Sequence, residues 1–333
     1  MKAVVVETLS EDFSGVLVKD VPMPEPGPGS VRIRIEAASV NFPDVLMTRG
    51  AYQFKPDLPF TPGLEAAGTV DAVGEGVEDL PVGTPVVAGM RFGAMAAFAL
   101  APRDAVRPMP PGMDFAQACA YPAAYLTAYV ALVRRGALQA GETLLVHGAA
   151  GGVGLAAVDL GKLLGATVIA TAGRDDKLAV VKDYGADHVI NYTQTDGRLG
   201  GFRDAVKALT EGQGADVIYD PVGGDVFDES VRCIAWGGRL LVIGFTSGRI
   251  PSVTANMPLI KGFSVVGVRA GEFGRRDPDK GAENIRQIDQ WAAEGRIRPH
   301  IHARLPLERT VEAMALLVDR AVVGKVVVMP GLG

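Results

Sequence analysis

The chain has 333 residues, of which 48% are hydrophobic and 21% charged, and its formal net charge is −5. This length and composition predict a globular protein of about two domains, and the slightly acidic balance gives no electrostatic basis for binding nucleic acid or an anionic membrane. The two cysteines, Cys119 and Cys233, are too few for a disulfide scaffold or a cysteine-rich metal site. No apolar run approaches the roughly 20 residues of a membrane span, and Glu7 comes too early for a signal peptide, so we expect a cytoplasmic protein.

The first 120 residues predict a compact, β-rich domain. Short β-branched runs at residues 2–6, 30–37 and 67–73 alternate with glycine and proline, and the segment PMPEPGPG at 22–29 cannot form a helix interior. We expect these strands to form a partly open barrel. Because this domain precedes a nucleotide-binding pattern, we assign it to the substrate side.

The centre of the chain carries a glycine-rich turn between a strand and a helix. In TLLVHGAAGGVG, residues 143–147 predict a buried strand, glycines follow at 148, 151, 152 and 154, and helical spacing continues to 164. A second strand at 167–171 completes the βαβ unit in which such a turn binds a pyrophosphate at a helix N-terminus. Ala149 takes the first glycine position of the usual G-x-G-x-x-G pattern, but the surrounding elements still predict a dinucleotide site. The residues that we expect to contact the cofactor in this turn are Ala150, Gly151, Gly152 and Val153.

Strands and helices then alternate, which predicts a doubly wound parallel sheet of the Rossmann type. The predicted helices are 122–133, 175–184, 202–210 and 226–234, and the further strands are 188–190, 215–219, 239–243 and 263–268. Ligands of such sheets bind at the carboxyl ends of the strands. The corresponding positions here are Gly173, 220–223, 244–246, Val268 and Arg269. The remaining chain predicts a helix at 279–294, a strand at 301–305, a helix at 307–319 and a strand at 324–329.

The residue at the end of the second parallel strand separates NAD from NADP sites. An NAD site places an acidic side chain there, about 20 residues after the glycine turn, to accept hydrogen bonds from the ribose 2′-hydroxyl. In this chain the position is Gly173, which would not repel a 2′-phosphate. Arg174 and Lys177 supply cations within one helical turn of this position; the alternative is that they are solvated surface charges. The neighbouring Asp175 and Asp176 are typical of a helix N-terminus. The pattern favours NADPH.

Several motifs resemble the medium-chain dehydrogenase/reductase family. They are SVNFPD at 39–44, PFTPGLEAAG at 59–68, VGEGVEDLPVGTPVV at 73–87, the central turn, and GKVVV at 324–328. The chain is similar to the zinc-free quinone oxidoreductase, or zeta-crystallin, branch of that family. The resemblance implies an α/β fold with a GroES-like β-barrel domain and a Rossmann doubly wound sheet. It implies a catalytic domain beginning with 1–120, an NADP-binding domain at 121–268, and a segment at 269–333 that returns to the catalytic domain.

The zinc ligands of related dehydrogenases are replaced in this chain. The resemblance aligns Asn41 and Ala123 with cysteines and Leu64 with a histidine, and none of these three side chains is a good zinc ligand. His300 and His302 could face one side of a strand, but no third ligand lies near them in sequence, so we interpret them as ordinary histidines. We expect no catalytic metal.

The family resemblance also implies roles for individual residues. Asn41 would lie near the nicotinamide and hydrogen-bond cofactor or substrate, and Tyr52 would either orient the substrate carbonyl or serve as a packing aromatic. Asp44 and Glu65 are expected to fix loop geometry. Thr127 would contact the nicotinamide amide, Lys177 and Tyr192 the 2′-phosphate, and Lys325 the cofactor cleft. Further cofactor contacts are expected at Val222, Gly244, Phe245 and Val268.

Together these features predict a metal-independent, NADPH-dependent reductase that transfers hydride to a small molecule, either a quinone or an α,β-unsaturated carbonyl compound. The alternative is a cofactor-binding protein with a redox-sensing or structural, crystallin-like role and little catalysis. We also expect a homodimer, because the strand at 263–268 is apolar and would form an open edge of the sheet.

Overall fold

The computed structural model describes residues 1–332, and its contacts divide the chain into two units. Unit 1 consists of Met1–Ala123 together with the chain from Ala292 onward, and unit 2 is Ala124–Trp291. Both division points fall inside helices, namely α3 (Pro122–Tyr129) and α10 (Pro278–Ala293). Among the residues described, no helix combines the length and the apolar character that crossing a membrane requires.

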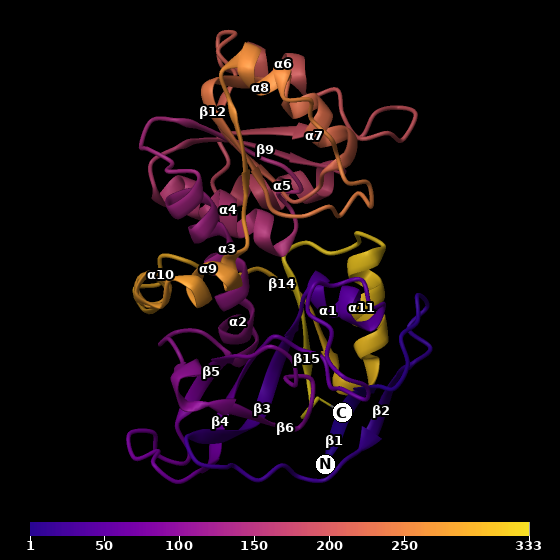
Figure 1. The fold of residues 1–333 in the computed structure, drawn as a ribbon, viewed down its shortest axis with the longest axis vertical. Helices are drawn as coiled ribbons and strands as arrows, with labels where there is room; N and C mark the ends of the chain where they lie inside the picture. Colours follow the sequence, from indigo (N-terminus) through magenta and orange to yellow (C-terminus); the bar gives the residue numbers. More distant parts are fainter. Residues whose placement is uncertain (333) are drawn as a thin grey trace. The chain divides into compact units, whose positions relative to one another are not determined.

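Unit 1 is built on a seven-stranded, mostly antiparallel sheet, in which the late strands β14 and β15 lie beside the early strand β3 (Figure 1). The order is β14-β15-β3-β4-β5-β7, and β6 pairs with β3. No ladder within residues 1–332 joins β14 to β7, so the sheet is open rather than a closed barrel. Its strands are β3 (Ser30–Val40), β4 (Glu65–Val73), β5 (Pro85–Gly89), β6 (Phe98–Pro102), β7 (Val106–Pro108), β14 (Ile301–Pro306) and β15 (Lys325–Met329).

Alternating side chains explain how this sheet forms its core. Val31, Ile33 and Ile35 of β3 are buried on one face and pack with Val326 and Val328 of β15, as expected for strands with a side-chain period of two. The other elements of unit 1 are short. They are the hairpin β1 (Lys2–Val6) and β2 (Val16–Asp20), the helices α1 (Phe42–Thr48), α2 (Phe115–Ala120) and α11 (Thr310–Val318), and two single 3₁₀ turns at Arg103–Ala105 and Leu307–Arg309.

Unit 2 contains a six-stranded, fully parallel sheet in the order β10-β9-β8-β11-β12-β13. The strands are β8 (Thr143–Val146), β9 (Thr167–Ala172), β10 (His188–Asn191), β11 (Ala215–Asp220), β12 (Ile234–Val242) and β13 (Ser264–Gly267). The chain winds outward from β8 to β10 and then returns to place β11 against β8. This reversal is the switch point at which doubly wound sheets bind ligands.

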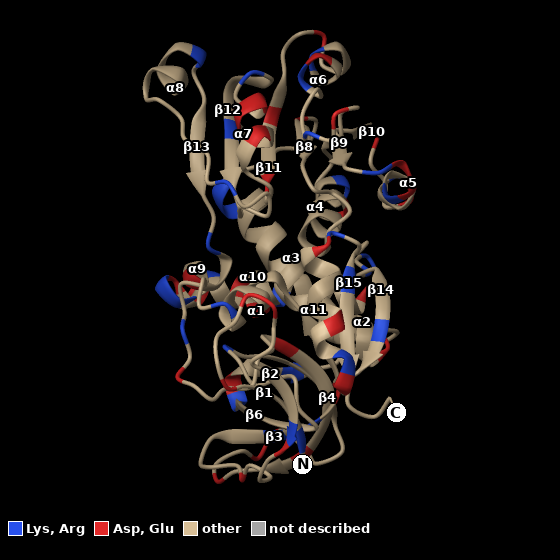
Figure 2. Ribbon diagram, turned by 90° about the vertical axis from the view of Figure 1, so that its right-hand side faces the viewer, with Lys and Arg blue, Asp and Glu red and all other residues tan. Residues whose placement is uncertain are grey.

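Helices flank the parallel sheet. Two of them, α5 and α6, carry many of the charged residues of unit 2 (Figure 2). The helices are α4 (Gly152–Leu163), α5 (Asp175–Asp183), α6 (Arg203–Leu209), α7 (Gly224–Ser230), α8 (Asn256–Lys261) and α9 (Ala270–Arg276), with a π-helix at Val130–Arg135 after α3. The central strands β8, β9 and β11 are largely buried, as strands covered on both faces require, whereas the edge strands β10 and β13 carry mainly half-buried or exposed side chains.

Two boundaries differ from those expected from the sequence. The chain returns to unit 1 at Ala292, not at 269, because α10 packs within unit 2 through the Tyr129 and Trp291 rings and through a hydrogen bond from Arg134 to Asn284. The expected helix 226–234 ends at Ser230, since Ile234 pairs with Ala215 and so begins β12 early.

Candidate functional site

Three polar side chains meet in unit 1 because of the register of its sheet. Asn41 directly follows β3, Glu65 begins β4, and Lys325 begins β15. Strand β3 pairs with both of the others, so that Ala38 lies opposite Ala66 and Val40 opposite Val326. Residues 284 positions apart in the sequence are thereby placed side by side. We call Asn41, Glu65 and Lys325 the polar triad.

The triad is closed by hydrogen bonds between all three members. The Lys325 ammonium donates to Asn41 Oδ1 at 2.6 Å and to Glu65 Oε1 at 3.1 Å, and Asn41 Nδ2 donates to Glu65 Oε1 at 3.0 Å. Glu65 is 1% exposed and Lys325 6%. The pair is therefore shielded from water, and each charge depends on the other for its stability.

The triad groups that can still form a strong hydrogen bond are N–H donors, not acceptors. Both carboxylate oxygens of Glu65 are engaged, since Oε2 accepts from the Ala123 backbone N–H at 2.7 Å. An ammonium group has three N–H donors, and the described residues accept two of those of Lys325. The second N–H of Asn41 has only weak partners, Ser39 O at 3.4 Å and Ser39 Oγ at 3.5 Å. The triad can thus donate to a carbonyl oxygen but has little capacity to accept.

Asp44 holds Asn41 in place from the first turn of α1. Its carboxylate accepts the backbone N–H of Asn41 at 2.8 Å and that of Gly63 at 3.0 Å. Asp44 is completely buried, and this burial raises its pKa to about 7, although both hydrogen bonds and the Lys325 charge act in the opposite direction. Asp44 thus fixes loop geometry, the role expected from the sequence, whereas Glu65 also neutralises a buried cation.

Tyr52 and Leu64 belong to the apolar surroundings of the unit 1 core. Both are partly buried and pack against the hydrophobic core of unit 1. Within residues 1–332, no hydrogen bond joins Tyr52 to the triad, so its expected role at the substrate carbonyl is not apparent from these contacts. The backbone oxygen of Leu64 accepts from Met90 N–H at 2.8 Å, which ties the start of β4 to the end of β5.

The positions aligned with zinc ligands serve other purposes in this fold. Asn41 belongs to the triad, Leu64 packs on the core, and Ala123 donates its backbone N–H to Glu65. Across the part of the chain that the structure describes, no three His, Cys, Asp or Glu side chains are grouped as metal ligands. Burial raises the pKa of the thiols of Cys119 and Cys233.

The glycine-rich turn of unit 2 depends on close backbone packing. Gly148 has φ of 55°, a conformation that favours glycine. A Cβ atom at Gly154 would overlap the carbonyl of Gly148 and lie 2.8 Å from Ala149 Cα, so only glycine fits there. No side chain caps α4 at Gly151, which leaves its first-turn N–H groups for an anion. The turn therefore has the close approach and the free helix end that a pyrophosphate needs, and Ala150 and Val153 belong to it.

The turn after β11 adjoins the glycine-rich turn, and the turn after β12 adjoins the turn after β11, since a Cβ atom at Gly244 would lie 3.4 Å from the Pro221 carbonyl oxygen. Burial raises the pKa of Asp220 to about 6, and its carboxylate accepts the N–H groups of Val222 and Gly223 at 2.8 and 2.9 Å. A Cβ atom at Gly148 would lie 3.2 Å from Val222 Cγ2, so the turns after β8 and β11 are in near contact. Val222 is buried and Phe245 is 38% exposed. Gly244 follows β12 and Val268 follows β13, so the expected cofactor residues share the carboxyl edge of the sheet.

The end of β9 combines a missing side chain with a buried lysine. A Cβ atom at Gly173 would lie 3.1 Å from Thr193 Oγ1 and 3.8 Å from Tyr192 Cε2, so Tyr192 adjoins this turn. Lys177 is 8% exposed, and burial, together with the nearby Arg174 charge, lowers its pKa. A phosphate beside such an ammonium would relieve part of the desolvation cost.

Arg174 contributes less positive charge here than the sequence implied. Its guanidinium forms a two-pronged ion pair with Asp176, at 2.9 and 2.6 Å. Thr127 lies on α3 in unit 2 and is partly buried.

One buried network was not expected from the sequence. His147 is fully buried directly before the glycine-rich turn, and its ring nitrogens lie 2.8 Å from Thr171 Oγ1 and 2.8 Å from Ser230 Oγ. Since Ser230 donates to the Val226 carbonyl, it accepts from His147 Nε2–H, and Nδ1 accepts from Thr171. Burial lowers the His147 pKa to about 3, so the ring is neutral and links β8, β9 and α7.

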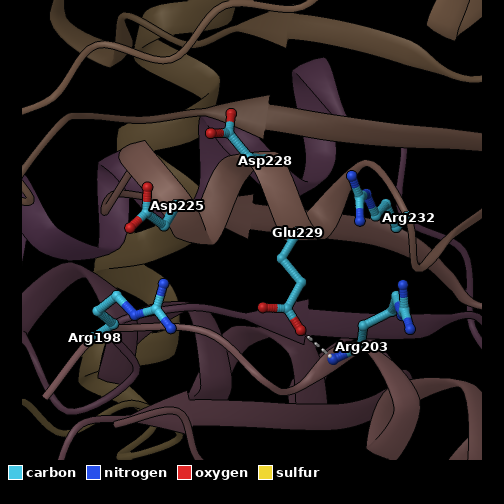
Figure 3. Close-up of a pocket in the computed structure, with 6 residues that line it drawn as sticks. All are labelled: Arg198, Arg203, Asp225, Asp228, Glu229 and Arg232. Carbon is cyan, nitrogen blue, oxygen red and sulfur yellow. Dashed lines mark hydrogen bonds between the residues drawn. The ribbon is translucent and has the colours of Figure 1, made fainter. Parts of the chain in front are cut away.

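A charged hollow of about 480 Å³ lies elsewhere in unit 2, lined by six residues (Figure 3). Glu229 points toward Arg203 and accepts its backbone N–H at 2.8 Å. Asp225 and Asp228 pair with Arg249. All six lining residues are charged, with as many acids as arginines, unlike the mainly hydrophobic lining of typical small-molecule sites, so we assign the hollow no ligand. The remaining lining residues are Arg198 and Arg232.

Comparison with known proteins agrees with this arrangement. Residues 27–111 match the family described as the alcohol dehydrogenase GroES-like domain, and residues 152–287 match the family described as zinc-binding dehydrogenase. The chain is 40% identical over 306 residues to the quinone oxidoreductase-like protein 2 homolog of Nematostella vectensis, covering 91% of this chain and 82% of that protein.

Two solved structures bound to NADPH are similar over nearly all of both chains. One is mycobacterial Rv1454c, with a TM-score of 0.90, 32% identity, and coverage of 99% of this chain and 100% of that one. The other is Escherichia coli quinone oxidoreductase, with a TM-score of 0.89, 28% identity, and the same two coverages.

Proposed function

This chain belongs to the quinone oxidoreductase-like group of the medium-chain dehydrogenase/reductase superfamily, and from that premise we propose that it is an NADPH-dependent reductase that needs no metal. Its acceptor is a quinone or an α,β-unsaturated carbonyl compound. The observation that carries the proposal is the turn at 148–154, where Gly154 leaves no room for a side chain and α4 begins without a cap. The NADPH complexes of the two similar structures support the choice of cofactor.

The cofactor would be held by residues at the carboxyl edge of the parallel sheet. The pyrophosphate would bind at Ala150, Gly151, Gly152 and Val153, and Lys177 and Tyr192 beside Gly173 would bind the 2′-phosphate. Thr127, Val222, Gly244, Phe245 and Val268 would complete the set within unit 2. When bound, NADPH supplies a hydride.

The chain's own contribution at the acceptor is orientation and hydrogen bonding. Negative charge builds up on the acceptor oxygen as reduction proceeds, and preorganised donors stabilise such charge. The free N–H of Lys325 and the weakly bonded N–H of Asn41 are the candidate donors in the triad, with the Tyr52 phenol as a third. Leu64 would give the acceptor an apolar neighbour. Solvent would provide the proton.

The test is NADPH consumption with 1,4-benzoquinone, 9,10-phenanthrenequinone, an enone and crotonyl-CoA. Turnover with at least one of them is expected, and it should survive dialysis against a strong chelator. Tyr52→Phe should lower kcat while leaving NADPH affinity unchanged, and Asn41→Ala should lower kcat as well. NADPH binding without turnover of any acceptor would contradict the reductase proposal and favour a sensing or structural role.

We also propose a homodimer that forms through β13. This strand ends the order of the parallel sheet, and Val265 on it is 38% exposed. Trp236, Leu259 and Ile260 are 79%, 80% and 68% exposed, and Trp236 lies against Gly262, which joins α8 to β13. An apolar open edge of this kind favours pairing with another strand. Light scattering should give a dimer at micromolar concentration and a monomer for Val265→Lys; a native monomer would contradict the proposal.

A further inference from the structure

We infer that unit 1 carries a specificity site for flat aromatic acceptors that bear an anionic substituent, formed by Phe54, Arg91 and Phe92. The inference rests on the proposed reductase function, because it names the acceptor class of that same site. We call these three residues the aromatic–arginine platform.

The platform is a layered stack. The Phe54 and Phe92 rings lie 6.0 Å apart between centroids at an interplanar angle of 30°, and the Arg91 guanidinium carbon lies 3.8 Å from the Phe54 centroid. Phe92 is 43% exposed and Arg91 is exposed, while Phe54 packs on the core of unit 1. The half-buried Phe54 ring therefore supports the exposed Phe92 ring and the exposed Arg91 cation, which are held by stacking rather than by a carboxylate.

Arg91 differs in this respect from other arginines of unit 1. Arg32 pairs with Asp71 and Arg103 with Asp79, each at 2.6 Å. Within residues 1–332, no aspartate or glutamate lies within ion-pair distance of Arg91. Stacking occupies the face of a guanidinium and leaves its N–H edge free for two parallel bonds to a carboxylate or sulfonate. Lys55 and Asp57 on the neighbouring loop carry opposite charges, so the charge of Arg91 is the net charge of the platform.

Sheet register brings the chain that leads into the platform alongside the polar triad. Gly89, the last residue of β5, lies opposite Glu65 of the triad, and Met90 N–H donates to Leu64. Arg91 is two residues beyond Gly89, which is at most about 7 Å of chain. On the other side, Phe54 is two residues beyond Tyr52. An acceptor whose carbonyl oxygen is held by the triad would therefore extend a second ring or a substituent toward the platform.

Acceptors that differ only in charge test this inference. We would compare kcat/KM for 1,4-naphthoquinone and its 2-sulfonate in the native protein and in Arg91→Met, which keeps an unbranched stem. Because the two acceptors differ in reactivity, the relevant quantity is the ratio of their kcat/KM values. Arg91→Met should lower the sulfonate-to-neutral ratio about tenfold, as expected for loss of a charge-assisted, two-pronged contact. Arg34→Met, which removes another exposed arginine of unit 1, should leave the ratio as in the native protein.

A binding measurement separates this inference from the proposed function. The affinity for 2-naphthalenesulfonate, measured by calorimetry without turnover, should fall about tenfold in Arg91→Met and should weaken with added salt. Phe54→Leu should weaken it as well, because the guanidinium loses its support. An unchanged ratio and an unchanged affinity in Arg91→Met would overturn the platform even if the native protein reduces quinones. Failure of all acceptors, with binding still dependent on Arg91, would overturn the reductase function and leave the anion site standing.

Discussion

The polar triad of unit 1 and the glycine-rich turn of unit 2 prepare their sites by opposite means. The triad concentrates charge, with a carboxylate and an ammonium almost fully removed from water and joined through an amide. The turn removes side chains, so that backbone atoms of Gly148, Ala149 and Gly154 come close together. The triad in unit 1 therefore depends on the charges of its side chains. The turn in unit 2 depends instead on the absence of side chains at its glycines.

The same contrast predicts different sensitivities to substitution. Replacing Glu65 or Lys325 with a neutral group of equal size should be severe, because it leaves the other buried charge uncompensated. Adding one methyl group should be severe in the turn, because its neighbours are backbone atoms that cannot rotate away. Each of the following measurements tests one side of this comparison.

The largest effect is expected for Glu65→Gln. The buried Lys325 ammonium would lose its counter-charge, at a cost of about 3–5 kcal/mol to the stability of unit 1. Hydrogen exchange of β4 and β15 amides measures this loss directly. The double variant Glu65→Gln/Lys325→Met should recover most of the lost stability, since no buried charge remains in that pair.

As a control, Glu36→Gln breaks an exposed pair with Arg34 and should cost less than about 1 kcal/mol. Equal losses in the two single variants would contradict the importance of burial.

Next is Gly154→Ala in unit 2. The added Cβ would overlap the Gly148 carbonyl, and overpacking of this kind costs about 1–3 kcal/mol. Gly151→Ala is the matched control, because its nearest neighbour, Gly148 O, lies at 3.4 Å, an ordinary contact. Thermal unfolding followed by the fluorescence of Trp236 and Trp291, both in unit 2, should therefore show a lower midpoint for the first variant alone. Similar midpoints would mean that the turn can relax.

Lys177→Ala should affect the proposed cofactor rather than the fold. Loss of a charge-assisted bond to the 2′-phosphate should weaken NADPH binding by about 1–3 kcal/mol and leave NADH binding nearly unchanged. Lys182→Ala on the same helix is the control, since Lys182 is exposed and its ammonium donates to the Asp187 carbonyl. Fluorescence titration with both nucleotides measures the effect. Native affinities that are equal for NADPH and NADH would refute the assignment of the 2′-phosphate site.

The last and most local effect is a pH dependence in unit 1. Because burial raises the Asp44 pKa from 3.8 to about 7, the folded state binds a proton that the unfolded state releases. The stability due to this proton is fully present below pH 3.8 and is lost as the pH rises through about 7, at up to about 1.4 kcal/mol per pH unit.

Asp44→Asn should remove that slope from the hydrogen exchange of unit 1. Asp220→Asn should change the slope of unit 2 instead, since burial raises the pKa of Asp220 to about 6. A slope in unit 1 that persists in Asp44→Asn would show that another group titrates there.

The sequence predicted best what depends on local patterns. The strand, turn and helix around residues 143–164 were expected close to their final bounds, because β-branched runs, glycine spacing and helical periodicity are all local signals. Helices α1 and α2 were not expected, since seven and six residues are too few to show periodicity. The early start of β12 was also missed, because pairing of Ile234 with Ala215 depends on the neighbouring strand.

Within the candidate site, the members of the triad were identified but their bonding was not. Lys325 and Glu65 are 260 positions apart, and only the pairing of β3 with both β4 and β15 brings them together. His147 was overlooked for a related reason. A single histidine before a glycine-rich turn gives no sign of its partners, Thr171 and Ser230, which lie on other elements.

The pairing of β15 with β3 also has a consequence for the order in which the protein folds during translation. A ribosome makes β3 and β4 early, but it makes all of Ala124–Trp291 before it reaches Lys325, a delay on the order of ten seconds or more. Until then Glu65 has no ammonium partner and β3 has an unpaired edge. Unit 2, being continuous in the chain, has no such delay. A stalled nascent chain from which all residues up to Trp291 have emerged from the ribosome should therefore hold a folded Rossmann sheet, while its first half is still vulnerable to protease.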